Sequence, residues 1–363
     1  MPLALCSFAL GSLPQMNEFD FIRQLRERTS AGRASTRLVA GIGDDAAVLR
    51  QSADRDLVIS TDLLVEGIDF HRDAIPPRLL GHKALAVSLA DIAAMGARPL
   101  WSLVSVGLPQ SAWESNSNDE FFSGYLALAD RFGVRLAGGD ISEAPQIVID
   151  SIVVGEVKAG HAVLRSTAKP GDHIFVTGHL GGAAAGLKLI ELGARIDAGG
   201  RQQEPDGTPS HKAPSDDDAI QSLVVRQLAP QPRVGWGIVL GEEHLATSMI
   251  DISDGLSSDL HHLCDESRVG AVIEAASIPL DGNVVQLCGR RALDPLALAL
   301  HGGEDFELLF TVSPENVSRL PKRVDGVRVS RIGEIIELSG KVVIREKNHD
   351  WDLTAQGFQH FNC

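Results

Sequence analysis

Apolar and polar residues alternate along this chain with two periods, one typical of helices and one typical of strands. Segments in which apolar residues recur every three or four positions predict helices at 17–29, 79–94, 120–132, 183–192, 219–228 and 256–266. Short apolar runs bounded by glycine, proline or acidic residues predict strands at 57–61, 100–108, 134–137, 147–157, 173–177, 248–252 and 307–312. Helices and strands thus alternate, which predicts an α/β or α+β fold.

The length of the chain and its changes in composition indicate two domains. For 363 residues, at about 150 residues per domain, we expect an N-terminal domain over 16–160 and a C-terminal domain over 161–363. Residues 1–15 have no basic stretch typical of a signal peptide, so we expect a disordered extension, with either Met1 or Met16 as the true start. Residues 194–217 are polar and rich in glycine and proline, which predicts a mobile surface insertion.

This insertion leads to a first testable prediction. Replacing residues 197–215 with a short Gly-Ser linker is expected to change turnover and melting temperature little, because a segment of this composition makes few packed contacts. Steady-state kinetics and thermal unfolding of the shortened chain test the prediction. A large loss of either quantity would mean that the segment docks against the rest of the protein.

Charge and cysteine content exclude several classes of protein. The 33 basic and 48 acidic residues give a net charge of −15, which disfavours a nucleic-acid-binding protein because such proteins neutralise phosphates with basic residues. No run approaches roughly 18 consecutive apolar residues, so no membrane-spanning helix is expected. The four cysteines form no close pair, which favours free thiols in a reducing compartment, and we expect a cytoplasmic protein.

Acidic residues follow apolar runs or lie in glycine-rich turns at five places. These are Gly41-Ile-Gly-Asp-Asp45, Ser60-Thr-Asp62, Gly138-Gly-Asp140, Asp251-Ile-Ser-Asp254 and Gly302-Gly-Glu-Asp305. A single Gly-Asp pair usually marks a turn, but buried carboxylates need partners, so five such places favour a shared ligand. Sets of oxygen ligands suit Mg²⁺ better than zinc, and Mg²⁺ ions held by acids commonly bind the phosphates of ATP.

One acid inside a predicted helix belongs with this set. Lys83, Val87 and Asp91 are spaced four residues apart and therefore share one face of the helix 79–94. The residues around Asp91 are small or apolar, which argues against a solvated surface acid. Arg165 is a candidate for holding phosphate oxygens through paired hydrogen bonds.

Several familiar motifs are absent from the sequence. It contains no GxxxxGK[ST] loop, no GxGxxG after a predicted strand and no GxSxG elbow, so the common nucleotide-binding and serine-hydrolase signatures are missing. The histidines His261, His262 and His301 have no metal-like spacing with cysteine, and we interpret them as helix-surface or core residues.

Six motifs, taken in order and with their spacing, resemble the thiamine-monophosphate kinase family. They are Gly41-Ile-Gly-Asp-Asp-Ala-Ala-Val, Ser60-Thr-Asp-Leu-Leu-Val-Glu-Gly, Lys83-Ala-Leu-Ala-Val-Ser-Leu-Ala-Asp-Ile-Ala-Ala-Met-Gly-Ala, Gly138-Gly-Asp, Ile250-Asp-Ile-Ser-Asp-Gly-Leu and Gly302-Gly-Glu-Asp-Phe-Glu-Leu. The resemblance runs from about Glu18 to Phe361, apart from 194–217. It implies the two-domain α/β (α+β) fold of the aminoimidazole ribonucleotide synthetase-like superfamily, with an N-terminal sheet domain and a C-terminal α/β domain. It also implies a homodimer formed through the N-terminal sheets and an ATP site without a P-loop.

The resemblance implies phosphorylation of thiamine monophosphate to thiamine diphosphate by ATP with Mg²⁺. The implied metal ligands are Asp45, Ser60, Thr61, Asp62, Asp91, Asp140, Asp251 and Asp254. The implied ATP contacts are Gly139, Asp140, Arg165 and Ser253, and the implied thiamine contacts are Glu304 and Phe358. An aromatic ring suits the cationic thiazolium. No catalytic base is assigned, because a phosphate monoester oxygen is already deprotonated near neutral pH.

One position departs from the family pattern. Where the family often has histidine after the Val-Glu-Gly motif, this chain has Asp69, with His71 two residues later. An acid can still face a cationic substrate, so Asp69 stays a candidate substrate-binding residue.

Related enzymes supply the alternatives. Selenophosphate synthetase would need a reactive cysteine near its N-terminus, and Cys6 lies outside the matched region. The hydrogenase-maturation protein uses a C-terminal cysteine, and this chain ends in Cys363, but the preceding Phe361-Asn362 differ from that family's Pro-Arg context. A non-catalytic ATP-binding regulator would keep the metal acids without turnover.

Overall fold

The structure is a computed structural model that describes residues 18–30, 37–113, 115, 117–196, 216–291, 294–347 and 349–358. The chain divides into two compact units, one of residues 1–34 with 359–363 and one of residues 35–358. In the first unit the described element is helix α1 (Glu18–Ser30), so the helix expected at 17–29 is present. The expected extension 1–15, Cys6, Cys363 and residues 197–215 of the insertion lie outside the described residues.

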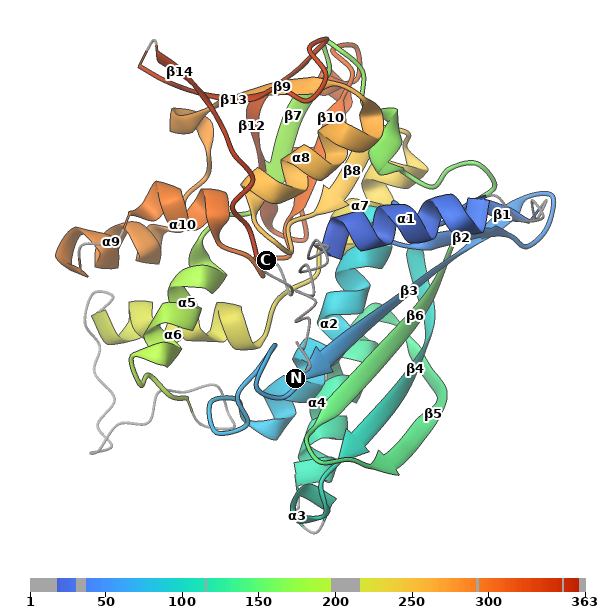
Figure 1. Cartoon of the computed structure of the whole chain (residues 1–363), viewed down its shortest axis with the longest axis vertical. Coiled ribbons are helices and arrows are strands. Elements are labelled where there is room, and N and C mark those ends of the chain that lie inside the picture. Colours follow the sequence, from blue (N-terminus) through green and yellow to red (C-terminus); the bar gives the residue numbers. More distant parts are fainter. Residues whose placement is uncertain are drawn as a thin grey trace, which may run out of the picture. The chain divides into compact units, whose positions relative to one another are not determined.

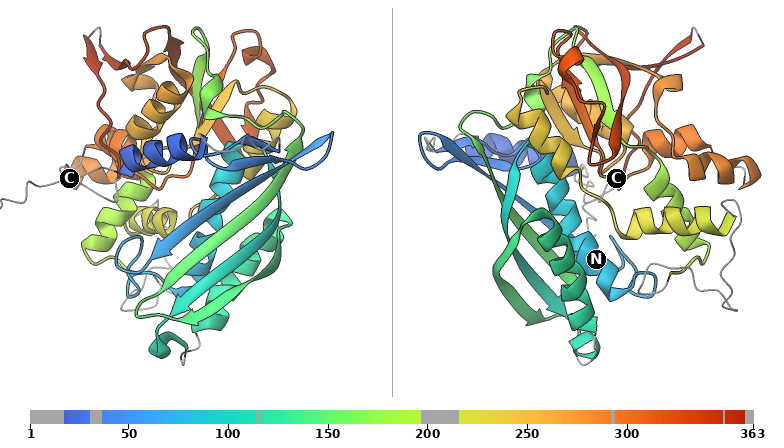
Figure 2. Two further views of the ribbon diagram at one scale, coloured as in Figure 1. Left: turned by 45° about the vertical axis from the view of Figure 1, so that its right-hand side comes forward. Right: turned by 180° about the vertical axis from the view of Figure 1, so that it is seen from behind.

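The N-terminal part of the second unit is a six-stranded sheet with the order β1-β2-β3-β6-β4-β5 (Figure 1). Its strands are β1 (Leu38–Ala40), β2 (Ala47–Arg50), β3 (Arg55–Val65), β4 (Arg98–Leu108), β5 (Arg135–Glu143) and β6 (Val148–Lys158). Neighbouring strands are antiparallel except β4 and β5, which are parallel. The helices of this part are α2 (Pro77–Ala94), α3 (Gln110–Trp113) and α4 (Ser117–Phe132), and α2 and α4 cover one face of the sheet (Figure 2).

Burial along the strands shows which face the helices cover. In β6, buried and partly exposed residues alternate, so Ile149, Ser151 and Val153 point toward the helices. Helix α2 is buried almost all round, because it lies between the sheet, α4 and helix α7 (Val234–Glu242) of the C-terminal part. This position explains why its sequence is apolar on every side.

The C-terminal part is built on an eight-stranded sheet with the order β14-β13-β9-β12-β7-β10-β8, in which β11 pairs with β12. The strands are β7 (His173–Thr177), β8 (Ser248–Asp251), β9 (Gly270–Glu274), β10 (Leu308–Val312), β11 (Arg323–Val324), β12 (Val327–Ile336), β13 (Val342–Glu346) and β14 (His349–Asp352). The helices are α5 (Gly182–Glu191), α6 (Asp216–Leu228), α7 (Val234–Glu242), α8 (Leu256–Ser267), α9 (Gly282–Arg291) and α10 (Pro295–His301). Strand β7 has apolar contacts on both faces, with Phe175 in one core cluster and Ile174 and Val176 in the other. The central strands therefore read as continuous apolar runs.

Each helix and strand predicted from the sequence is present, but two strand bounds were wrong in a way that matters for the site. Strand β3 continues to Val65, since its pairing with β6 is unbroken from Arg55 onward. Asp62 therefore lies inside a strand and not after one. Gly138-Gly-Asp140 likewise belongs to β5 and not to a turn, because these residues pair with β4.

Several elements of the structure were not predicted from the sequence, namely β1, β2, α3, α7, β9, α9, α10 and β11–β14. Most are short, and α7 begins only two residues after Pro232, where proline suggested an irregular segment. None of the helices in the described ranges is both long and apolar enough to cross a membrane. Cys264 and Cys288 are buried free thiols.

Candidate functional site

A tight turn before β2 presents the first carboxylate of the site. Gly43 has φ +121°, a conformation that glycine adopts without strain, and it places Asp44 and Asp45 just ahead of the strand. The buried carboxylate of Asp45 accepts two hydrogen bonds from Arg165, Nη2 to Oδ1 at 2.6 Å and Nε to Oδ2 at 3.0 Å. The Arg165 backbone amide donates to Asp44 Oδ1 at 2.7 Å. These hydrogen bonds join the turn before β2 to Arg165, which lies in the segment between the last strand of the first sheet and the first strand of the second.

Strand β3 and helix α2 supply the next side chains. Ser60 and Asp62 share the face of β3 that packs toward α2, and Ser60 Oγ donates a hydrogen bond to Asp91 Oδ2. Burial raises the pKa of Asp62 to about 6. Burial and the charges of Asp62 and Asp251 raise the pKa of Asp91 well above its ordinary value. These carboxylates lie close enough to repel one another when ionised.

Three carboxylates from three different elements meet at this point. Asp45 from the turn, Asp91 from α2 and Asp251 from the end of β8 each place an oxygen within 4.8 Å of the others. Burial, followed by the charge of Asp45, raises the pKa of Asp251 well above its ordinary value. Oxygen ligands in this number and spacing suit a hard divalent cation.

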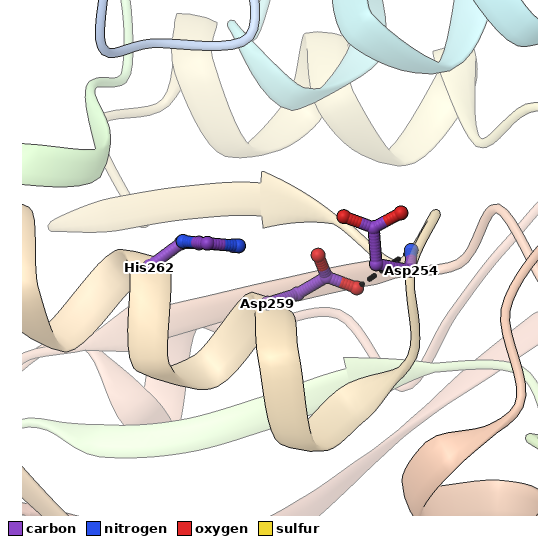
Figure 3. Close-up of side chains that lie close together, drawn as sticks. All are labelled: Asp254, Asp259 and His262. Carbon is purple, nitrogen blue, oxygen red and sulfur yellow. Dashed lines mark hydrogen bonds between the residues drawn. The ribbon is translucent and has the colours of Figure 1, made fainter. Parts of the chain in front are cut away.

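A second group of side chains lies at the start of α8 (Figure 3). Asp254, Asp259 and His262 each offer one ligand atom within 4.8 Å of the others. Asp259 Oδ2 accepts hydrogen bonds from the amides of Asp254 at 3.2 Å and Gly255 at 3.0 Å, which fixes the loop that carries Asp254. Burial lowers the pKa of His262 to about 4, so the ring is neutral near pH 7.

Asp259 and His262 were not among the site residues predicted from the sequence. The spacing of the histidines from cysteine gave no signal, whereas the spacing of three between Asp259 and His262 puts both residues on one face of α8. His261 and His301 instead bond to Ser257, through its carbonyl and its hydroxyl respectively.

Other candidates from the sequence lie apart from the three-carboxylate group. Thr61 is on the opposite face of β3 and donates to Asp150 Oδ1 at 2.6 Å. Gly139 and Asp140 are exposed on β5, an edge strand. Asp69 accepts a hydrogen bond from the Val65 amide at 2.7 Å and thus closes the turn after β3.

The loops that carry Ser253, Glu304 and Phe358 pack against one another. The Glu304 amide donates to the Ser253 carbonyl at 2.7 Å, and the Phe358 amide donates to the Asp254 carbonyl at 3.2 Å. Phe358 is 51% exposed and lies beside the loop that carries Asp254.

Asp305, which the sequence analysis grouped with the candidate carboxylates, has a structural role. Its carboxylate accepts hydrogen bonds from the Gly181 amide at 2.6 Å and the Ala183 amide at 3.1 Å. These amides lie at the N-terminus of α5, whose free N–H groups need acceptors. The expectation of a shared ligand therefore does not extend to Asp305, which caps a helix instead.

Fold and site together define the class of protein. The family model described as AIR synthase related protein, N-terminal domain, matches residues 43–157, and the corresponding C-terminal domain model matches residues 169–345. The two models cover most of the two sheets, and the three-carboxylate group takes Asp45 and Asp91 from the first model and Asp251 from the second. The chain is thus a two-domain protein of the AIR synthase related class, as the resemblance implied.

The relatives identify the family within that class: the chain belongs to the thiamine-monophosphate kinases. It is 37% identical to the thiamine-monophosphate kinase of Escherichia coli K12 over 352 residues, which covers 95% of this chain and 98% of the relative. It is 33% identical to that of Bacillus subtilis 168 over 350 residues, with coverage of 95% and 100%. A solved structure described as AaThiL complexed with AMPPCP and TMP matches with a TM-score of 0.78 and 29% identity, covering 98% of this chain and 100% of that one. The selenophosphate synthetase and hydrogenase-maturation alternatives are therefore set aside.

Proposed function

We propose that this chain transfers the γ-phosphoryl group of ATP to thiamine monophosphate by a direct in-line reaction and so forms thiamine diphosphate and ADP. One observation carries the proposal: Asp45, Asp91 and Asp251 converge from both domains within 4.8 Å of one another, with Arg165 beside them, in a chain of this family. Such a site is suited to holding and neutralising two phosphate-bearing substrates.

The donor set fits Mg²⁺. The ligand atoms of the three-carboxylate group are oxygens, and Asp62 Oδ2 is a buried oxygen without a hydrogen-bond partner in the described parts of the chain. A buried carboxylate oxygen of this kind is costly unless a cation satisfies it. We propose Asp45, Ser60, Asp62, Asp91, Asp251 and Asp254 as the ligands that this geometry supports. Thr61 and Asp140 remain proposed ligands on the family resemblance alone.

The proposed contacts with ATP are Gly139, Asp140, Arg165 and Ser253. Arg165 pairs with Asp45, so its guanidinium lies beside the carboxylates of the proposed cation site and is suited to contact a phosphate oxygen held by the same cation. Gly139 leaves no room for a side chain, since a Cβ there would lie 1.8 Å from the Val104 carbonyl oxygen.

Bound Mg²⁺ supplies positive charge that offsets the repulsion between the two phosphate groups. The protein side chains then have to hold the acceptor phosphate in line with the γ-phosphorus. The acceptor oxygen forms a bond to the γ-phosphorus. At the same time the bond between the γ-phosphorus and the β–γ bridging oxygen breaks, and ADP leaves with the electron pair of that bond. No proton has to be removed from the acceptor, so no general base is required.

We place the thiamine portion beside Phe358 and Glu304, with Asp69 as a further candidate. Phe358 is exposed next to the Asp254 loop, and its ring offers a π face to the thiazolium cation. Replacing Phe358 with alanine is expected to weaken use of thiamine monophosphate by about 1–2 kcal/mol while leaving ATP affinity nearly unchanged. Steady-state kinetics with each substrate varied in turn test this, and unchanged kcat and KM would remove the aromatic contact from the proposal.

A homodimer formed through the N-terminal sheets is also part of the proposal. The face of the first sheet that α2 and α4 leave uncovered exposes Leu63 and Trp101, at 57% and 43%. Exposed apolar side chains on a sheet face are typical of association surfaces. The free thiols of Cys264 and Cys288 fit the cytoplasmic location that we propose for this reaction.

Product identification tests the proposed activity directly. Purified protein incubated with ATP, Mg²⁺ and thiamine monophosphate is expected to yield thiamine diphosphate, detected by chromatography and mass. ATP binding without any turnover would favour a non-catalytic ATP-binding regulator instead, and the proposed activity would then be wrong.

Substituting Asp91 is expected to have opposite effects on stability and activity. Because the pKa of Asp91 is raised, its ionisation costs the metal-free fold stability as pH rises from 3.8 toward the raised value, and the full cost is present at higher pH. Asp91→Asn keeps the acceptor for Ser60 and removes the charge, so the metal-free protein is expected to melt about 2–4 °C higher at pH 8. The same variant should lose most of its activity and its stabilisation by Mg²⁺. Thermal unfolding in chelator at pH 5 and pH 8 checks this, and a variant less stable than wild type at pH 8 would contradict it.

A further inference from the structure

A buried lysine on α2 has no part in the reaction described so far. The Lys83 side chain is 1% exposed, and its ammonium lies 2.6 Å from Glu304 Oε1. A charge buried to this extent is tolerated only when it is paired and hydrogen-bonded. The pair joins α2, in the N-terminal domain, to the Gly302-Gly-Glu-Asp305 loop of the C-terminal domain.

A third residue completes the arrangement around this carboxylate. Gln227, a buried residue of α6, donates from Nε2 to Glu304 Oε2, while Lys83 Nζ also donates to the Gln227 carbonyl at 3.4 Å. Both oxygens of Glu304 are therefore held, one by α2 and one by α6. We call Lys83, Glu304 and Gln227 the interdomain clamp.

The clamp holds a strained piece of backbone. Glu304 has φ +64° and Phe306 has φ +48°, a left-handed conformation that is unfavourable for residues other than glycine. Strain of this kind persists only where surrounding contacts enforce it. The buried ring of Phe306 clusters with Val87 and Ala90 of α2, so side chains at both ends of the 304–306 segment contact the helix.

The other side of the same segment holds the proposed site. The Glu304 amide donates to the Ser253 carbonyl at 2.7 Å, and the Phe306 amide donates to the Ile252 carbonyl at 2.9 Å. Segment 304–306 thus lies between α2, which carries Asp91, and the 251–254 segment, which carries Asp251 and Asp254.

We propose that Lys83 is a positioning residue that holds the 304–306 segment on α2 and thereby keeps Ser253 and Asp254 in register with Asp91. The inference rests on the proposed function for the identity of the ligands, which are a divalent cation and the nucleotide phosphates. By holding this segment, Lys83 sets the distance between the carboxylates of one domain and those of the other. Lys83 itself touches neither substrate.

The test measures ion and nucleotide binding without turnover. Mn²⁺ is the probe, titrated by electron paramagnetic resonance in the presence of an ATP analogue with a methylene β–γ bridge. Lys83→Met is expected to weaken Mn²⁺ binding about 10-fold or more, the loss typical when a residue that orients metal ligands is removed. Binding equal to that of wild type would overturn the proposal.

A matched control separates positioning from stability. Arg50→Met breaks an ion pair with the buried Asp56, which joins β2 to β3 and includes no residue of α2 or of segment 304–306. It is expected to lower the melting temperature yet leave Mn²⁺ binding within about 2-fold of wild type, well below the loss expected of Lys83→Met. If both variants weaken binding in proportion to their loss of stability, Lys83 is merely structural and the proposal is wrong.

A double variant covers the case in which Lys83→Met folds poorly. Lys83→Met with Glu304→Met leaves no unpaired buried charge and is expected to recover much of the melting temperature. Mn²⁺ binding should stay weak, because the residue-304 end of the segment is still not tied to α2, and recovered binding would overturn the proposal. Since none of these measurements needs turnover, a wild-type protein that bound Mn²⁺ and nucleotide but made no thiamine diphosphate would refute the proposed function alone.

Discussion

Replacing Asp254 with asparagine will lower kcat by about 100-fold or more while the protein stays folded. The substitution keeps the shape of the side chain and removes one negative charge from the proposed cation site. The backbone of residue 254 holds the loop independently of that charge, since its amide donates to Asp259 and its carbonyl accepts from Phe358. Steady-state kinetics over a range of Mg²⁺ concentrations, together with thermal unfolding, measure both effects.

The control for this variant is an acid far from the site. Asp350 pairs with Arg345 on the surface of the β13–β14 hairpin, and Asp350→Asn is expected to leave turnover unchanged. Near-normal turnover of Asp254→Asn at low Mg²⁺ would remove Asp254 from the proposed ligands. A collapse of the fold would instead mean that the charge of Asp254 is needed for stability.

Free thiamine will not be phosphorylated to a detectable extent, whereas thiamine monophosphate will. The proposed site holds an acceptor by its phosphate, and thiamine offers only a neutral hydroxyl. That hydroxyl would need a general base, whose absence costs about 100-fold or more in rate. His262, the imidazole grouped with Asp254 and Asp259, has its pKa lowered to about 4 and is a weak base at neutral pH.

The experiment compares the two acceptors at equal concentration with the same enzyme, ATP and Mg²⁺. Thiamine diphosphate from thiamine monophosphate, with no thiamine monophosphate from thiamine, is the expected result. Equal turnover of free thiamine would refute the requirement for a phosphate acceptor.

The helix that organises the site was predictable because its pattern is strong. Residues 79–94 are apolar and small over several turns, and the placement of Asp91 among them is enough to indicate a buried functional acid. The grouping of Asp305 with the candidate carboxylates was wrong, because an acid in a glycine-rich turn has the same appearance in the sequence whether it caps a helix or faces a ligand.

Residues whose role depends on long-range pairing were beyond sequence reasoning. Asp140 and Thr61 belong to motifs that resemble a metal site, yet strand pairing puts Asp140 on the edge strand β5 and Thr61 on the outer face of β3. The side of a sheet on which a residue lies depends on where the strand begins, and a shift of one residue reverses it. Their part in binding stays a prediction.

Local spacing and composition are enough to predict the alternation of helices and strands, the class of fold, the acidic character of the site and the motifs of the family. The meeting of Asp45, Asp91 and Asp251 is instead a result of the tertiary structure. The same holds for the grouping of His262 with Asp254 and for the pairing of Lys83 with Glu304. Each of these contacts joins segments whose distance is set by the packing of two sheets and their helices, and no pattern within one segment encodes that distance.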